Sequence, residues 1–347
     1  MAPSLKAEEV SEVIAAGRDC YPAGDDNGYN KRTTADLLAG LSSWSPPMRK
    51  RSAKALGKRE GDFLPTLRKM LAGSDRYGRY GACEALGSLG ARADAAAPQL
   101  RALLKDPDPW LESLACNAIA RLGSEARYAS QNDLLLLAAR KNPADPRAMA
   151  HRFASFALFC PPENQEPSII GKSLDTVDRS LLYPAMNSLL QNEDCIPRGV
   201  VGPYLLKLTD RDLAAILPAV VKAVEFMAPT NEMFADGIRC SGLDLLSRLH
   251  IREGMDLCVS TIDFRWGLQW EKRLEYLTRY GSCAKAVVPE LRKKIPEKSA
   301  DGTKAFNKCI ADIEASKETP AVISLKDFIA KASAGGAAPN TTKQRSP

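Results

Sequence analysis

The sequence predicts an all-α protein built as an α-solenoid, in which antiparallel helix pairs stack along the chain. Three observations support this prediction. One helical pattern recurs over residues 48–57, 78–87 and 111–120, at offsets of 30 and 33 residues. A second helical pattern follows it, after a short polar turn. Aromatic residues make up only 6% of the chain, which suits helices packed through leucine and alanine. Self-similarity at this period indicates stacked supersecondary units rather than one globular core.

The first helix of each copy carries three small columns and one large aliphatic column. In register, the columns are Ser52/Ala82/Ala115, Ala53/Cys83/Cys116, Ala55/Ala85/Ala118 and Leu56/Leu86/Ile119. Spacings of three and four residues place these columns on one helical face. The small side chains let a neighbouring helix approach closely, and the large one fills the groove between helices.

The second helix of each copy begins with a proline near its start. Residues 64–71 match residues 97–104 at an offset of 33, which aligns Pro65 with Pro98. Proline suits the first helical turn because the missing N–H has no partner there. The turns that follow contain Asp75 and Asp108, and aspartate suits the N-cap of the next helix.

The stretch from Leu103 through Gly123 resembles a HEAT repeat of the short bacterial, bilin-lyase-like type. That family usually carries a Val-Arg pair at the start of its first helix. The pair reads Met48-Arg49, Gly78-Arg79 and Leu111-Glu112 here, so the arginine is lost in the third copy. The resemblance implies a right-handed solenoid of HEAT-like helix pairs. HEAT arrays serve as scaffolds, receptors and occasionally enzymes, so the fold alone does not assign a function.

Helices are also expected outside these three copies. In the second half the Val-Arg place is taken by Ile238-Arg239, and Gly242, Leu243, Leu245 and Leu246 fill the core columns. The second half resembles uncharacterised HEAT-bearing bacterial proteins of planctomycete type at 181–185, 191–194, 233–239 and 279–281. In such proteins the array is often one part of a larger secreted polypeptide. The expected helices cover residues 5–16, 33–41, 133–140, 146–159, 178–190, 199–208, 210–226, 232–249, 254–262, 268–280, 283–295, 303–314 and 324–332.

These patterns divide the chain into five segments. An N-terminal helix and loop take residues 1–32, and the first half of the solenoid takes 33–160. An irregular, proline-containing connector follows at 161–174, and the second half of the solenoid takes 175–333. Residues 334–347 are rich in Gly, Ala, Pro, Thr and Ser, which predicts a disordered tail.

Composition indicates a folded protein of the cell interior. The chain has 347 residues, a net charge of +6 and nine cysteines, an odd number without a CxxC pair. This is not a disulfide framework, and it favours a reducing, cytoplasmic compartment. We find no signal peptide and expect no membrane insertion. A secreted or periplasmic location is the alternative if the chain is a fragment of a longer one.

The sequence offers no catalytic, cofactor-binding or metal-binding motif. Its two histidines, His151 and His250, have no Glu or Cys neighbour at ligand spacing. We therefore assign no catalytic residue, no cofactor and no metal, and we favour a non-catalytic role. A Ser/His/Asp or Cys/His arrangement stays open, because such groups meet only in space.

Two clusters of side chains are candidates for a binding surface. One is basic, and the other combines tryptophan with arginine, a common composition at contact surfaces. The alternative interpretation is that the charges form solvated helix faces and that the tryptophans pack between repeats. The candidate residues are Arg49, Lys50, Arg51, Arg68 and Lys69 in the basic cluster, and Arg265, Trp266, Trp270 and Arg273 in the aromatic one.

Three functional hypotheses follow. The first is a non-catalytic scaffold that binds a protein or peptide on the long concave surface of the solenoid. The second is a nucleic-acid-binding protein, similar to HEAT-like DNA glycosylases, that uses the basic stretch from Arg49 to Lys69. The third, a bilin-lyase-like enzyme, rests only on the repeat type. We favour the first.

Overall fold

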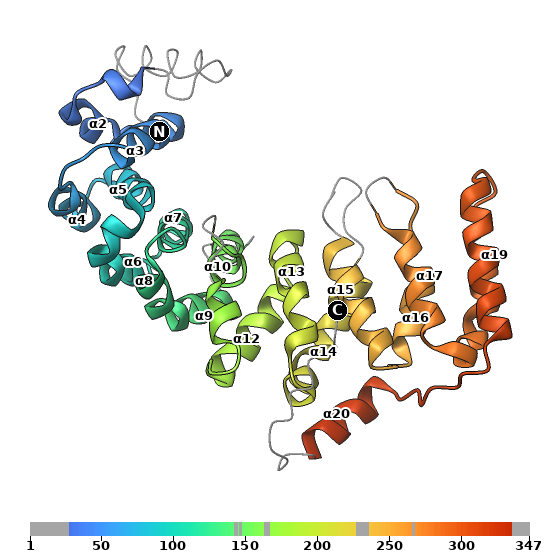
Figure 1. Ribbon diagram of the computed structural model, residues 1–347. Helices are drawn as coiled ribbons and strands as arrows, with labels where there is room; N and C mark the ends of the chain where they lie inside the picture. The colour runs from blue at the N-terminus through green and yellow to red at the C-terminus, as the bar shows by residue number, and fades with distance from the viewer. Residues whose placement is uncertain are drawn as a thin grey trace. The chain divides into compact units, whose positions relative to one another are not determined.

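The computed structural model of the chain describes residues 28–141, 145, 148–162, 167–226, 236–265 and 268–334 (Figure 1). The helix expected at 5–16, Trp266 and the tail from 335 onward lie outside these residues. The described residues are helical and form no strand beyond one isolated bridge between Ile251 and Ile323. They fold into two compact units. Unit 1 contains Met1–Leu137 and Lys141–Lys172, and unit 2 contains Ala138–Arg140 and Ser173–Pro347.

Unit 1 is a stack of helix pairs, as the repeat predicts. Helices α3, α5, α7 and α10 pack side by side in one row, and α4 and α6 pack against α5 and α7 from the other side. The elements of unit 1 are η1 (Tyr29–Lys31), α2 (Thr34–Gly40), α3 (Pro46–Gly57), α4 (Leu64–Ala72), α5 (Arg76–Leu89), η2 (Gly90–Ala96), α6 (Ala97–Leu103), α7 (Pro109–Ile119), α8 (Ser124–Ala129), α9 (Gln131–Ala139), α10 (Met149–Phe159) and α11 (Ile169–Ser173), although the last residues of α9 and α11 fall in unit 2.

Unit 2 repeats this arrangement. Helices α13, α15, α17 and α19 form the first row, and α12, α14 and α16 form the second, so both units are α-solenoid stacks. The elements are α12 (Arg179–Leu190), α13 (Cys195–Val201), η3 (Gly202–Lys207), α14 (Asp210–Glu225), α15 (Asp236–Arg248), α16 (Glu253–Ser260), α17 (Trp270–Thr278), η4 (Gly281–Val287), α18 (Val288–Arg292), α19 (Ala300–Ala315) and α20 (Leu325–Ala334).

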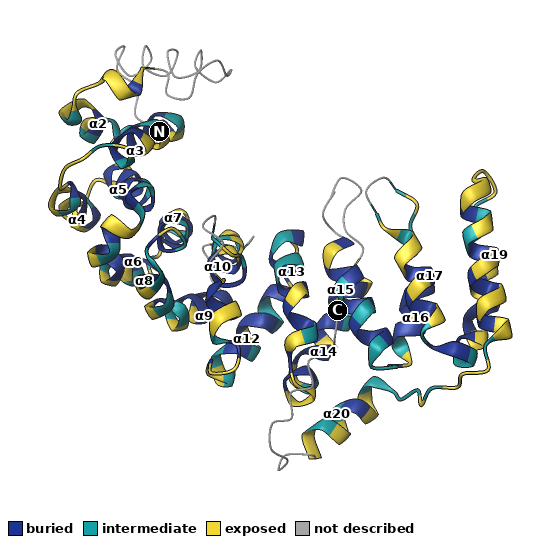
Figure 2. Ribbon diagram, in the orientation of Figure 1, coloured by how far each residue is buried: buried dark blue, intermediate teal, exposed yellow. Residues whose placement is uncertain are grey.

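The predicted core columns lie between the helices. All twelve residues of the four columns in α3, α5 and α7 are buried, and so are the four column residues of α15. Buried residues follow the faces where neighbouring helices meet (Figure 2). Gly81 shows how close this packing is, because a Cβ on it would lie 2.1 Å from the carbonyl oxygen of Leu41.

Side-chain caps fix where the helices begin. Thr33 forms a capping box with Asp36 at the start of α2. Asp75 accepts a hydrogen bond from the backbone N–H of Tyr77, and Asp108 accepts one from that of Trp110. These caps satisfy donors that the first helical turn leaves without partners.

Three predicted segments differ from the structure. The helix expected at 199–208 is the end of α13 followed by the 3₁₀ helix η3, and the helix expected at 283–295 is η4 followed by α18. Gly281 has a φ of +54°, so the α-helix cannot continue through it, and Pro289 lies in the first turn of the next α-helix. Likewise, Gly90 has a positive φ where α5 gives way to η2, and Pro98 lies in the first turn of the α-helix that follows η2. The expected connector at 161–174 contains the short helix α11.

Candidate binding surface

The arginine at the start of the first-row helix is a structural residue. Arg49 in α3 is only 2% exposed. Its Nη1 donates hydrogen bonds to the carbonyl oxygens of Ser43 at 2.8 Å and Trp44 at 3.0 Å, in the turn before the helix. A charged donor on two backbone carbonyls is a strong pairing for groups that the turn leaves without helical partners. Arg49 therefore ties the preceding turn to α3.

Other first-row helices use arginine in the same way. Arg239 of α15 donates to the carbonyl oxygens of Val224 at 3.2 Å and Phe226 at 2.7 Å, at the end of α14. Arg79 of α5 donates to that of Leu71 at 3.2 Å. Each of these two arginine side chains thus caps the C-terminal turn of the helix that precedes its own helix.

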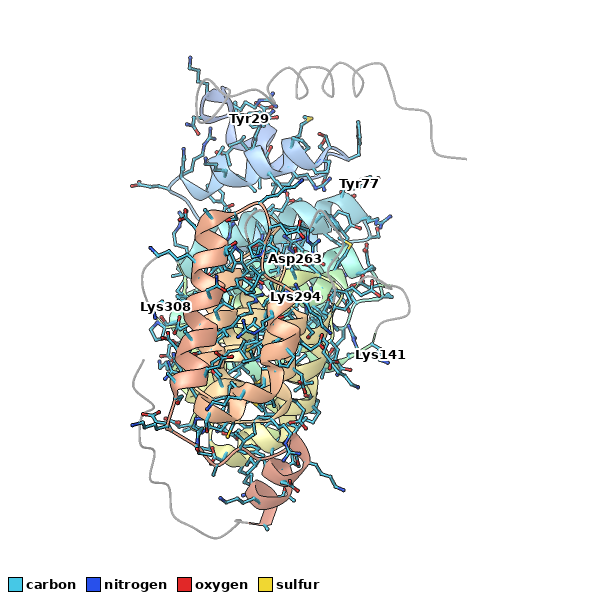
Figure 3. All side chains as sticks on the ribbon, turned by 90° about the vertical axis from the view of Figure 1, so that its right-hand side faces the viewer. Tyr29, Tyr77, Lys141, Asp263, Lys294 and Lys308 are labelled. Atoms are coloured by element: carbon cyan, nitrogen blue, oxygen red, sulfur yellow. The ribbon has the colours of Figure 1, made fainter. Side chains whose placement is uncertain are left out.

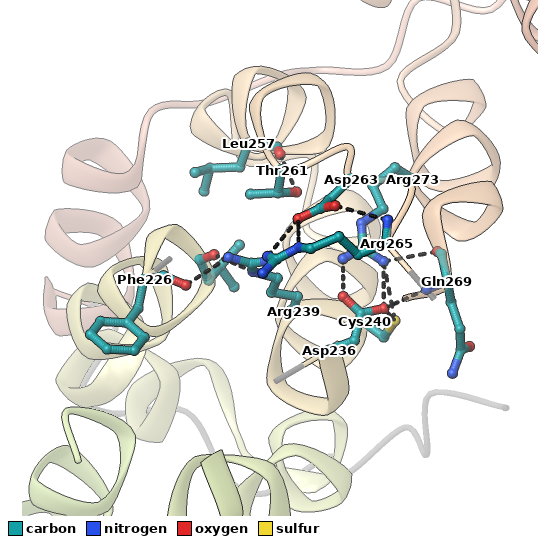
Figure 4. A network of polar contacts seen from close by, with 11 residues as sticks. Phe226, Asp236, Arg239, Cys240, Leu257, Thr261, Asp263, Arg265, Gln269 and Arg273 are labelled. Carbon is teal, nitrogen blue, oxygen red and sulfur yellow. Dashed lines mark hydrogen bonds and ion pairs between the residues drawn. The ribbon is translucent and has the colours of Figure 1, made fainter. Parts of the chain in front are cut away.

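Arg273 holds a second kind of buried contact, with a carboxylate (Figure 4). It is 1% exposed, and its Nη1 lies 2.9 Å from Oδ2 of Asp236 while Nη2 binds Oδ1 of the same residue. Asp236 also accepts from the backbone N–H of Gln269 at 2.8 Å. Burial opposes ionisation of Asp236, but its hydrogen bonds and ion pair with Arg273 outweigh burial and hold its pKa below the usual value. The pair fixes the start of α15 to the start of α17.

The prediction that Arg49 and Arg273 belong to a contact surface is therefore wrong. Both guanidinium groups are enclosed by backbone carbonyls or a carboxylate and cannot reach a partner. A buried arginine and an exposed arginine look alike in sequence, because either can stand beside a tryptophan or a lysine. Only their burial in the folded structure distinguishes the two kinds of arginine.

The other predicted basic residues do not form one pairing network. Lys50 and Lys69 are exposed on α3 and α4. Arg51 is half-buried, with its guanidinium 6.0 Å from the ring of Tyr29. Arg68 is exposed and donates to Gln99 at 3.0 Å.

Trp270, from the predicted aromatic cluster, belongs to a group of aromatic rings that differs from the predicted one. The ring centroid of Trp270 lies 5.7 Å from that of buried Phe306 on α19, in a stacked arrangement. Phe264 packs against both, at 5.4 Å and 6.1 Å, yet remains 46% exposed. Arg265 lies beside it and pairs with Asp263, with Nε 2.7 Å from Oδ2. A large apolar ring is thus held in water by a rigid stack.

A second exposed ring lies at the same ends of the first-row helices. Phe226 follows α14, is 37% exposed and lies under the guanidinium of Arg198 at 4.4 Å. Its carbonyl oxygen accepts from Arg239, so the buried network also positions its backbone (Figure 4). We call Phe226, Phe264 and Trp270 the unit 2 edge.

The surface around the unit 2 edge is polar. Glu271 and Lys272, which follow Trp270 in α17, are exposed. Asp263, which precedes Phe264, pairs with Arg265, with Nη2 2.6 Å from Oδ2 (Figure 3). An apolar centre with a polar rim is the usual anatomy of a protein interface.

Unit 1 carries its own exposed apolar residues at the starts of first-row helices. Tyr77 of α5 is 40% exposed, Trp110 of α7 is 36% exposed, and Met149 opens α10. Tyr77 packs edge-on against Tyr80, whose hydroxyl donates to Asp108. We call Tyr77, Trp110 and Met149 the unit 1 edge.

The comparisons with known proteins concern the repeat itself. Residues 64–152 match the family of HEAT repeats. This stretch runs from α4 to α10 and includes the α5 and α7 copies of the predicted pattern. Residues 64–152 are therefore HEAT repeats within an all-helical chain. No curated protein matches it in sequence.

HEAT repeats commonly serve as protein-interaction scaffolds. Among the residues that the structure describes, no three His, Cys, Asp or Glu side chains lie together as a metal site would require. The same residues include no helix long and apolar enough to cross a membrane.

Four buried thiols of the chain are not activated nucleophiles. Burial raises the pKa of Cys240 to about 11, and burial does the same for Cys309. Burial also raises the pKa of Cys83 and Cys258 well above its usual value. A reactive cysteine needs a lowered pKa, because the thiolate is the nucleophile.

Sequence reasoning missed the exposed rings. Tyr77 lies two positions before Arg79, and Trp110 lies two positions before Glu112, the matching residue of the next copy. The two rings are thus 33 residues apart, and the repeat register could have identified them. Phe226 and Phe264 lie in loops outside the register. Nothing in their local sequence distinguishes an exposed ring from a packed one.

Proposed function

We propose that this protein is a non-catalytic scaffold that binds a protein partner, and that the unit 2 edge is its principal contact surface. The observation that carries the proposal is the exposure of Phe264, 46% in water on a stack whose other members are partly or fully buried. HEAT repeats supply a rigid frame for such a surface.

The geometry of the unit 2 edge suits an interface hot spot. Aromatic side chains dominate binding energy when they are pre-positioned at the centre of a patch. The ring of Phe264 packs against Trp270 and Phe306, and the Asp236–Arg273 pair fixes the helix that carries Trp270. A side chain that is already ordered loses little conformational entropy on binding. We therefore propose that the contact lies at the ends of the first-row helices of unit 2.

The nucleic-acid alternative has lost some of its support. Arg49 is buried, and Arg59 donates to the carbonyl oxygen of Asn30 at 3.1 Å and to the hydroxyl of Thr34 at 2.9 Å. Two cations of the basic stretch are therefore paired with acceptors of the protein itself. The exposed lysines that remain are equally consistent with a solvated helix face.

Affinity capture with matched variants tests the proposal. The full chain, a Phe264→Ala variant and a Phe156→Ala variant are used as baits, and captured proteins are quantified by mass spectrometry. Phe156 is the control because its ring is 39% exposed on α10 and belongs to neither edge. Removing a hot-spot ring costs about 2 kcal/mol, so Phe264→Ala should lower specific capture by about thirtyfold.

The Phe156→Ala bait should capture the same proteins as the unmodified chain. Urea unfolding of each bait establishes that the variants are folded. Equal capture by the Phe264→Ala chain and the unmodified chain would contradict the proposal.

A further inference from the structure

The C-terminal segment of unit 2 folds back across the stack. After α19, residues 316–324 run past the turns that precede α16 and α18, and α20 then packs on α14 (Figure 1). A terminal cap of a solenoid covers the last repeat. Helix α20 instead packs on a helix that lies further back in the second row, so it does not serve as such a cap.

Backbone hydrogen bonds hold the returning segment in place. The N–H of Ser282 donates to the carbonyl oxygen of Glu318 at 2.8 Å. The N–H of Ile323 donates to that of His250 at 3.1 Å, and the N–H of Arg252 donates back to Ile323 at 2.8 Å. Gly281 permits this approach, because a Cβ there would lie 2.4 Å from the Glu318 oxygen.

Helix α20 itself is held more weakly than the segment that leads to it. Phe328 is the one residue of α20 that is classed as buried, and Leu325, Ile329 and Ala332 are half-buried. The start of the helix is tied by the N–H of Leu325, which donates to the carboxylate of Glu253 at 2.9 Å. A ten-residue helix is marginal in water without tertiary packing.

The face beneath α20 is only partly covered. A groove of about 740 Å³ runs between α20, the start of α14 and the end of α15. Its lining is mixed, with apolar Leu249, Ile323 and Phe328 beside the charged side chains of Arg211 and Lys331. The surface therefore accepts an amphipathic helix and has room beyond the one that it holds.

We propose that this face of α14 and α15 is a docking site for an amphipathic helix of a protein partner, and that α20 occupies it in the partner's absence. The partner helix carries large apolar residues at the i, i+3 and i+4 spacing of Leu325, Phe328 and Ile329. The tether gives α20 a high effective concentration, so it competes with every helix that binds there. This proposal depends on the proposed scaffold function in one respect only, namely that the partner is a protein.

A labelled peptide tests the site without a partner in hand. The probe is a synthetic peptide of residues 316–334, and its binding to the full chain is followed by fluorescence anisotropy. In a Phe328→Ala chain the resident helix is loosened, so the peptide should bind at least about tenfold more tightly than to the unmodified chain. Lys326→Ala is the control, since Lys326 is exposed on the same helix.

Equal affinity for the Phe328→Ala and Lys326→Ala chains, or no binding to a folded Phe328→Ala chain, would overturn the proposal. Hydrogen exchange of the unmodified chain gives an independent measurement. Amides of α20 should exchange at least about tenfold faster than those of α14, which stay protected when α20 undocks. Equal protection of the two helices would also overturn it. Neither measurement depends on the unit 2 edge.

Discussion

At the scale of single residues, buried arginines decide how the helix pairs join. Arg49 and Arg239 bind backbone carbonyls of the turn or helix before them, and Arg273 binds the carboxylate of Asp236. Charged side chains are costly to bury unless they are paired and hydrogen-bonded. Their cost is offset here by acceptors that would otherwise lack partners. These residues therefore act on stability, whereas the partner binding that we propose uses the exposed rings.

Replacing Arg49 tests this structural role. Arg49→Ala removes both hydrogen bonds to Ser43 and Trp44, and we expect a loss of about 2–4 kcal/mol in the free energy of unfolding. Lys50→Ala, at the exposed neighbouring position, should change it by less than about 0.5 kcal/mol. Urea denaturation measures both. Similar small effects for the two variants would show that Arg49 is not a structural tie.

Glu84 gives the fold a dependence on pH. Burial raises the pKa of Glu84 to about 7, although the positive charges of Arg49 and Lys50 oppose this rise. The raised pKa means that the folded state binds the proton more tightly than the unfolded state. The resulting stability is fully present below the unfolded pKa near 4.5 and is lost as pH rises through 7.

We therefore expect the unmodified chain to lose up to about 3 kcal/mol between pH 4.5 and 7.5 relative to Glu84→Gln, which cannot ionise. Urea unfolding of both chains across this range provides the measurement. A parallel pH dependence of the two chains would show that Glu84 ionises normally.

At the scale of secondary-structure elements, close approach between helices depends on the small columns. Gly81 of α5 lies against the backbone of Leu41, and the added Cβ of alanine would require that backbone to move. Overpacking of this kind typically costs 1–3 kcal/mol. Gly199 of α13 is a matched control, because nothing lies within 4 Å of its Cβ position.

Opposite effects are expected for the two glycines. Gly81→Ala should lower the free energy of unfolding by about 1–3 kcal/mol. Gly199→Ala should raise it by about 0.5–1 kcal/mol, because alanine costs less backbone entropy in a helix than glycine. Thermal and urea unfolding report both changes. Stabilisation by Gly81→Ala would mean that α5 is not packed as closely as the structure has it.

The elements also show what sequence can and cannot predict. The columns from Ser52 to Ile119 repeat strictly, so the first-row helices and their buried faces followed from spacing alone. The 3₁₀ segments η3 and η4 did not, because glycine and proline mark a break without specifying the conformation that follows. The returning segment at 316–324 was missed as well, since its partners are backbone atoms far away in sequence.

The candidate site was harder to predict for a related reason. A basic residue beside a tryptophan has the same composition whether it is buried or exposed. Trp270 was predicted as a candidate for a binding surface, but its ring stacks on Phe306, which lies on another helix 36 residues later. Exposure depends on such tertiary neighbours, so only the structure separates Arg273 from Arg265.

At the scale of the whole molecule, the net charge of +6 raises the question of a polyanionic partner. Binding through apolar rings depends weakly on salt, whereas each phosphate contact adds to a steep dependence. We expect the affinity for the captured partner to fall less than about fivefold between 50 and 200 mM salt. A loss of about a thousandfold over this range would instead indicate a nucleic acid.

The most direct test of the central claim is hydroxyl-radical footprinting of the full chain with and without its captured partner. The account predicts that labelling of Phe264 and Phe226 falls strongly in the complex, while labelling of the exposed control Phe156 is unchanged. Unchanged labelling of Phe264 and Phe226, with protection elsewhere on the chain, would contradict the assignment of the unit 2 edge as the contact surface.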